Sequence, residues 1–172
     1  DVYEKAVYSS AILIAFLAFY TLAYHLLKSI LDEKLSWYGR HFSSAVAAFI
    51  YVANPAAANI FFDFSLFVGY AFAPLILFLV IEMFNRPRAW SALAIGAAGL
   101  WWMSAIKAHW IVFGALLLVP PLVTWGIRHW RSQGLEGVVR NLIAIAVIVG
   151  FYLSFSAYWL IPFLFASGER FV

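Results

Sequence analysis

The stretch FSLFVGYAFAPLILFLVI, from Phe64 to Ile81, contains no charged side chain. The hydrocarbon core of a bilayer is about 30 Å thick, so a helix needs roughly 20 largely apolar residues to cross it. We therefore predict that this stretch is a membrane-spanning helix. Five other uncharged stretches of similar length occur in the chain: Ala6–Leu27, His41–Phe62, Ala89–Ile106, Ala108–Ile127 and Asn141–Gly168.

The composition agrees with this pattern. Of the 172 residues, 66% are hydrophobic and only 11% are charged, whereas a soluble domain has roughly a quarter charged residues. These values exclude an ordinary soluble domain and a disordered chain. The absence of cysteine excludes disulfides and thiolate metal sites. The sequence thus predicts an all-α fold: a polytopic transmembrane helical bundle of about six spans, with residues 1–172 forming a single transmembrane domain.

The positions of lysine and arginine predict how the bundle is oriented. Eight of the 11 basic residues lie in alternate gaps between the apolar stretches, and three lie at the other ends. Short cytoplasmic loops are enriched in basic residues. We therefore expect a multi-pass protein of the cell membrane in which both ends of this chain are extracytoplasmic. The cytoplasmic set would be Lys28, Lys34, Arg40, Arg86, Arg88, Arg128, Arg131 and Arg140.

Two predicted connections on the extracytoplasmic side have unusual sequences. Asn54-Pro55 interrupts the second stretch, and proline within a helix removes a backbone hydrogen bond. We expect a helix from about His41 to Ala53, followed by an irregular or re-entrant segment from Asn54 to Asp63 that lines a cavity. The fourth and fifth stretches are joined only by Lys107-Ala-His109, which predicts a tight outer hairpin. Both termini look like cuts, so we expect this chain to be a fragment of a longer protein.

These two connections contain the candidate site residues. Asp63 is a candidate general base, although it is also a favoured residue for capping the next helix. Lys107 and His109 lie among tryptophans; they are candidates either for binding a lipid-linked phosphate or for an interfacial aromatic belt with a cation at headgroup level. Asn54 lies in the same interrupted segment as Asp63, and a site role for Asn54 comes only from the family resemblance described below.

Other polar residues have simpler interpretations. Glu82 and Arg86 have the i,i+4 spacing of an intrahelical ion pair. We interpret His25, His41 and His129 as interfacial. The basic residues are spread over short gaps, which argues against nucleic acid as a partner. Nothing in the pattern predicts a metal site, a haem or another cofactor. Small residues in the fourth stretch predict close helix packing through a face that contains Ala92, Gly96 and Gly99 or Ala98.

Three segments together resemble the GT-C superfamily of membrane glycosyltransferases, in particular its arabinofuranosyltransferase-like members. The segments are Tyr51-Val-Ala-Asn54-Pro55, Gly69-Tyr70-Ala-Phe-Ala-Pro74 and Tyr158-Trp159-Leu160-Ile-Pro162. The resemblance implies transfer of a sugar from a polyprenyl-phosphate donor at the extracytoplasmic face. It also implies that the catalytic acid lies on the first outer loop of the full protein. No Asp-x-Asp motif is present from which a catalytic base could be assigned.

Two other classes of function remain open. A structural or assembly subunit of a larger membrane complex would explain the scarcity of ionisable residues within the spans. A secondary transporter would explain the broken helix, but no inverted repeat and no midplane charge is evident. The expected partners are the lipid bilayer, a lipid-linked sugar phosphate and other membrane subunits.

Overall fold

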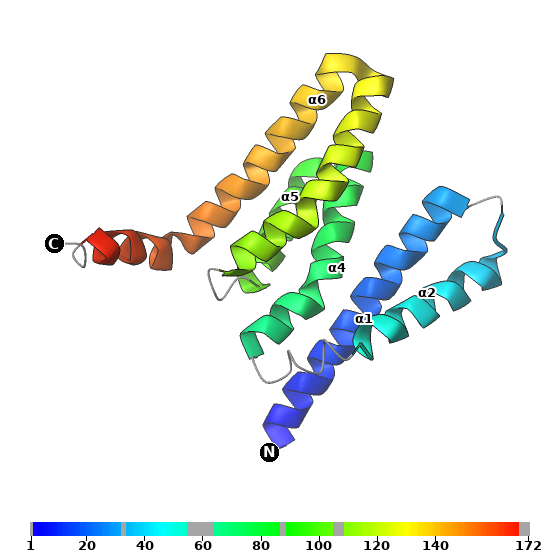
Figure 1. Ribbon diagram of the computed structural model, residues 1–172, viewed down its shortest axis with the longest axis horizontal. Helices are drawn as coiled ribbons and strands as arrows, with labels where there is room; N and C mark the ends of the chain where they lie inside the picture. The colour runs from blue at the N-terminus through cyan, green and yellow to red at the C-terminus, as the bar shows by residue number, and fades with distance from the viewer. Residues whose placement is uncertain (1, 32–33, 55–63, 87–88, 105–108, 169–172) are drawn as a thin grey trace.

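The structure is a computed structural model that describes residues 2–31, 34–54, 64–86, 89–104 and 109–168. Every regular element in these ranges is an α-helix, which confirms the predicted all-α class. The helices form a splayed bundle, and the C-terminal turns of the last helix project to one side of it (Figure 1). They are α1 (Val2–Leu31), α2 (Trp37–Val52), α4 (Phe64–Asn85), α5 (Trp90–Ser104) and α6 (His109–Gly168).

Helix α6 consists of two arms that meet at Gly134. This glycine has φ 63° and ψ −151°, a conformation that interrupts the helix. The chain reverses its direction there, at the yellow part of the ribbon in Figure 1. The two predicted stretches Ala108–Ile127 and Asn141–Gly168 therefore lie on separate arms, with the turn between them as predicted.

The ends of α2 follow from local hydrogen bonding. The Ser36 hydroxyl accepts a hydrogen bond from the Gly39 backbone N–H at 3.1 Å, which caps the first turn. At the other end the Ala53 N–H donates to the Phe49 carbonyl at 2.8 Å, and the helix stops before Pro55. The predicted end at Ala53 is confirmed. The helix starts at Trp37, before the expected start at His41, because Ser36 caps the additional first turn.

Contacts between helices show their relative directions. Helices α1 and α4 run parallel, since Tyr8 packs on Phe67 near their starts and His25 contacts Glu82 near their ends. Helix α5 runs parallel to the second arm of α6, where Trp101 stacks on Tyr152. Helix α2 runs opposite to α1 and α4, and α5 runs opposite to α4 and to the first arm of α6. Successive helical segments therefore alternate in direction (Figure 1).

Two clusters of buried side chains hold the helices together. The larger one joins α4, α5 and α6 around Ile76, Val80, Ala94, Ala97 and Ile148. The smaller one joins α1, α2 and α4 around Ala11, Ala15, Phe67 and Ala71. The close packing of α5 is confirmed; its predicted face is right at Gly96 and Ala98 but wrong at Ala92 and Gly99.

The packed face of α5 contains Ala94, Ala97 and Ala98, which are fully buried. In contrast, Ala92 is exposed, and a side chain added at Gly99 would meet no atom within 4 Å. The prediction used only the spacing of small residues, and several such faces exist in a helix this rich in alanine and glycine.

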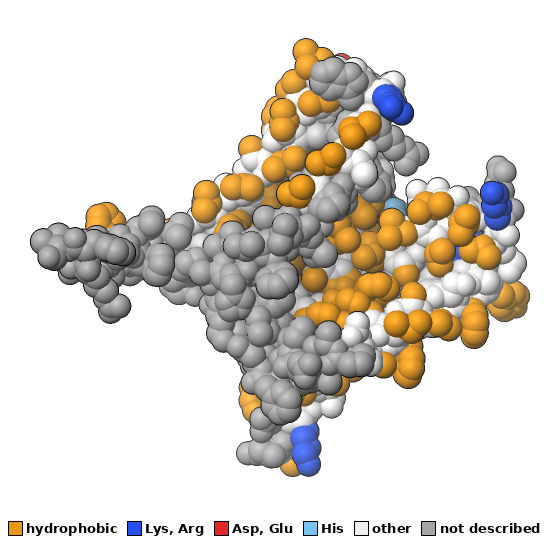
Figure 2. All heavy atoms as spheres, viewed as in Figure 1, with side chains coloured by type: hydrophobic (Ala, Val, Ile, Leu, Met, Phe, Trp, Pro, Cys, Tyr) orange, Lys and Arg blue, Asp and Glu red, His pale blue; other side chains and the backbone are white. Residues whose placement is uncertain are grey.

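Three helical segments in the described part of the chain are long and apolar enough to cross a membrane: Lys5–Leu31, Phe67–Asn85 and Gly134–Ser154. Trp90–Trp101 is apolar but shorter. Apolar side chains are spread widely over the described part of the surface that Figure 2 shows. Leu17, Phe42, Phe49 and Leu142 are each more than half exposed. Such a surface suits a lipid environment rather than water.

Candidate functional site

The predicted site residues lie at one end of the bundle as far as the structure describes them. Asn54 is exposed and follows the end of α2. His109 is the first residue of α6, although its side chain is not described. Because the helices alternate in direction, the end of α2 and the start of α6 lie at the same end. Asp63 and Lys107 lie outside the described residues, as does the expected re-entrant segment beyond Asn54.

The best-defined structure at this end is a reciprocal pair of tyrosines. The Tyr51 hydroxyl donates to the Tyr70 backbone carbonyl at 2.8 Å, and the Tyr70 hydroxyl donates to the Tyr51 carbonyl at 2.5 Å. The two rings stack with their centroids 4.2 Å apart and their planes within 2° of each other. The pair, which we call the tyrosine clasp, joins the last turn of α2 to the first half of α4.

Each carbonyl in the clasp is one that proline leaves without a helical donor. In an α-helix the carbonyl of residue i accepts from the N–H of residue i+4. Proline has no N–H, and prolines stand four residues after both tyrosines, at Pro55 and Pro74. An unsatisfied carbonyl is costly in an apolar environment. Each tyrosine hydroxyl therefore satisfies the carbonyl that the other proline frees.

Helix α1 covers the clasp. The Phe19 ring stacks on Tyr51 at 4.4 Å with an interplanar angle of 20°. Nearby, Tyr51 and Val52 pack against the buried cluster that contains Ala11 and Ala15 of α1 together with Phe67 and Ala71 of α4. The small alanines allow α1 to approach closely, so three helices meet around this pair.

Sequence reasoning noted both tyrosines only as parts of a family pattern and missed their pairing. The available signal was the repeated Tyr-x-x-x-Pro spacing, which occurs at Tyr51, Tyr70 and Tyr158. This spacing leaves the tyrosine carbonyl without the N–H of residue i+4, so the carbonyl needs a donor from elsewhere. Which side chain supplies the donor depends on how the helices are rotated and packed.

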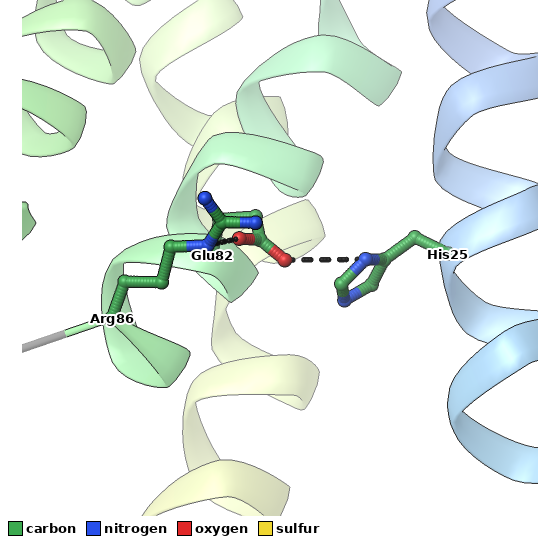
Figure 3. A network of polar contacts seen from close by, with 3 residues as sticks. All are labelled: His25, Glu82 and Arg86. Atoms are coloured by element: carbon green, nitrogen blue, oxygen red, sulfur yellow. Dashed lines mark ion pairs between the residues drawn. The ribbon is translucent and has the colours of Figure 1, made fainter.

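The opposite end of the bundle contains a buried carboxylate (Figure 3). Glu82 of α4 is 5% exposed. Its Oε2 atom lies 2.5 Å from Arg86 Nε, which confirms the predicted i,i+4 ion pair. Its Oε1 atom lies 3.2 Å from His25 Nδ1 on α1. The interpretation of His25 as merely interfacial was therefore incomplete.

His41, at the same end as Glu82, lies among aromatic rings. Its Nδ1 atom is hydrogen-bonded to the Tyr20 hydroxyl. The Tyr24 and Trp37 rings lie 4.6 and 4.2 Å from the imidazole, centroid to centroid. This arrangement links the start of α2 to α1, and rings of this kind are common at the membrane interface.

Among the described residues, no three His, Cys, Asp or Glu side chains lie close enough together to bind a metal ion. Comparison with protein-family models, with curated proteins and with solved structures finds no match.

Proposed function

We propose that this chain is a six-span membrane domain that binds a polyprenyl-phosphate-linked sugar at its extracytoplasmic end and takes part in transferring the sugar. The observation that carries the proposal is the placement of the proline-broken end of α2 and the start of α6 at the same end of the bundle. Lys34, which follows α1, Arg86, which follows α4, and the Gly134 turn of α6 belong to the opposite end.

The proposal assigns a role to each candidate residue. A lipid-linked donor has its chain in the bilayer and its phosphate and sugar at the surface. The enzyme therefore needs a cation near the phosphate and a positioned carboxylate near the sugar. Lys107 would bind the phosphate, His109 would donate a hydrogen bond to it, Asp63 would act as the base, and Asn54 would bind sugar hydroxyls.

Turnover of a lipid-linked sugar by the full-length protein in vesicles tests this assignment. We expect Asp63→Ala and Lys107→Ala each to lower turnover by about 100-fold or more, as is typical when a catalytic or charge-stabilising group is removed. Lys34→Ala is the matched control, because Lys34 is exposed at the opposite end of the bundle. Normal turnover in both site variants would contradict the assignment.

An assembly subunit is the second candidate. It is favoured by the second arm of α6, which packs on α5 through one face while Leu142, Ile143 and Leu153 on its other faces are about half exposed or more. Cross-linking in native membranes distinguishes the two functions. An assembly subunit would form a stable complex through this arm and show no sugar turnover.

A further inference from the structure

We propose that Tyr51 and Tyr70 are positioning residues, and that the tyrosine clasp sets the positions of Ala53 and Asn54 at the end of α2. This inference rests on the proposed function for its catalytic consequence. Its structural part concerns only how the end of α2 is held.

The clasp acts on the turn that leads to Asn54. Tyr51 lies in the last turn of α2, and the final helical hydrogen bond runs from the Ala53 N–H to the Phe49 carbonyl. Beyond it the helix cannot continue in the usual way, because Pro55 offers no N–H to the Tyr51 carbonyl. The Tyr70 hydroxyl occupies that acceptor instead. The positions of Ala53 and Asn54 are thus tied to α4 by this hydrogen bond as well as to α2.

The other half of the clasp ties α4 in the same way. Pro74 lies inside α4 and frees the Tyr70 carbonyl, which accepts from Tyr51. The stacked rings and the Phe19 ring hold both hydroxyls in place. Because each bond fixes the partner that makes the other one, the two bonds act as a unit. Loss of one hydroxyl should therefore loosen the end of α2 as a whole.

A cysteine reporter tests the structural part. The chain has no cysteine, so Ala53→Cys provides a single thiol at an exposed position next to the clasp. We expect Tyr51→Phe and Tyr70→Phe each to change its labelling rate with a charged maleimide by about threefold or more, as the loss of one hydrogen bond would allow. Tyr38→Phe is the matched control, since Tyr38 lies on the same helix and is 78% exposed. A second reporter, Lys34→Cys, should label at an unchanged rate in every variant.

A second substitution tests whether the effect of Tyr51→Phe arises from the loss of its hydrogen bond to the Tyr70 carbonyl. Pro74→Ala returns an N–H to the Tyr70 carbonyl, so Tyr51→Phe should then alter the labelling rate much less. Unchanged labelling in both tyrosine variants of the original background would overturn the inference. A change that Pro74→Ala does not reduce would also contradict the mechanism.

Sugar turnover tests the catalytic part separately. We expect both phenylalanine variants to lower kcat with little change in KM for the lipid-linked donor, because Asn54 would be misplaced while the donor phosphate stays bound. If labelling responds as expected but the unsubstituted protein transfers no sugar, the proposed function fails and the structural part stands. If the unsubstituted protein transfers sugar and both variants match it, the clasp has no catalytic role.

Discussion

Glu82 shows how a single buried charge shapes the packing of this chain. A carboxylate that is 5% exposed on an apolar helix needs compensating donors. Arg86 supplies one from the same helix, and His25 supplies another from α1. The Arg86 side chain is 70% exposed, so most of it lies at the surface of the protein. The His25 contact is therefore the one that links two helices.

We expect Glu82→Gln to lower the free energy of unfolding by about 1–3 kcal/mol, because a neutral amide replaces the carboxylate that contacts Arg86 and His25. Thermal or denaturant unfolding in detergent micelles measures the change. Glu136→Gln is the control: Glu136 is exposed, and its replacement should fall within about 0.5 kcal/mol of the original protein. Equal effects of the two substitutions would show that the Glu82 network contributes little.

At the scale of elements, the turns and the tight contacts depend on individual small residues. Gly134 reverses the chain within α6 at a positive φ. Ala94, Ala97 and Ala98 let α5 lie close to α4 and α6. The turn requires a particular backbone conformation, whereas the close packing of α5 requires small side chains. Different substitutions test these two requirements.

Gly134→Ala should destabilise the protein by about 1–3 kcal/mol, because an L-residue rarely adopts φ 63° with ψ −151°. The added methyl group would meet no atom within 4 Å, so the cost comes from the backbone alone. Gly150→Ala is the matched control within a regular helical part of the same element, also without a neighbour within 4 Å. It should be neutral or stabilise by up to about 1 kcal/mol. Equal unfolding midpoints for the two variants would contradict the role of the turn.

Ala94→Leu should destabilise the packing of α5 by roughly 1–3 kcal/mol or more, because Ala94 is fully buried and the larger side chain must displace its neighbours. Ala92→Leu adds the same volume two residues away at an exposed position and should have almost no effect. Unfolding of both variants in the same detergent gives the comparison. A larger loss for Ala92→Leu would support the face that sequence spacing alone suggested.

At the scale of the whole molecule, alternating helix directions bring the ends of distant helices together. Lys34 follows α1, Arg86 follows α4 and Arg131 comes just before the Gly134 turn of α6, so these three basic residues fall at one end of the bundle. Asn54 and the start of α6 fall at the other. Combined with the enrichment of basic residues in cytoplasmic loops, this arrangement underlies the proposed orientation.

Single-cysteine labelling in intact cells or sealed vesicles tests that orientation. Lys34→Cys and Leu135→Cys should react with an impermeant reagent only after the membrane is opened, because both lie at the basic end. Ala53→Cys should react from the outside without such treatment. If Lys34→Cys and Ala53→Cys label from the same side, α2 does not cross the membrane and the six-span arrangement is wrong.

The amino-acid sequence by itself determined the helical class, the turn between the two arms of α6 and the end of α2 near Ala53. These features depend on local properties: apolar length, the missing N–H of proline and the charged residues between two apolar stretches. The i,i+4 pair of Glu82 and Arg86 was predictable for the same reason. The number of spans, the site at Asp63 and Lys107, and sugar transfer remain predictions.

Only the tertiary structure decided which side chains meet across helices. The pairing of Tyr51 with Tyr70, the contact of His25 with Glu82 and the buried face of α5 all depend on how each helix is rotated about its axis. In a chain that is apolar on nearly every face, hydrophobic periodicity does not specify that rotation. It is set instead by the fit of small residues and by the few polar groups that need partners.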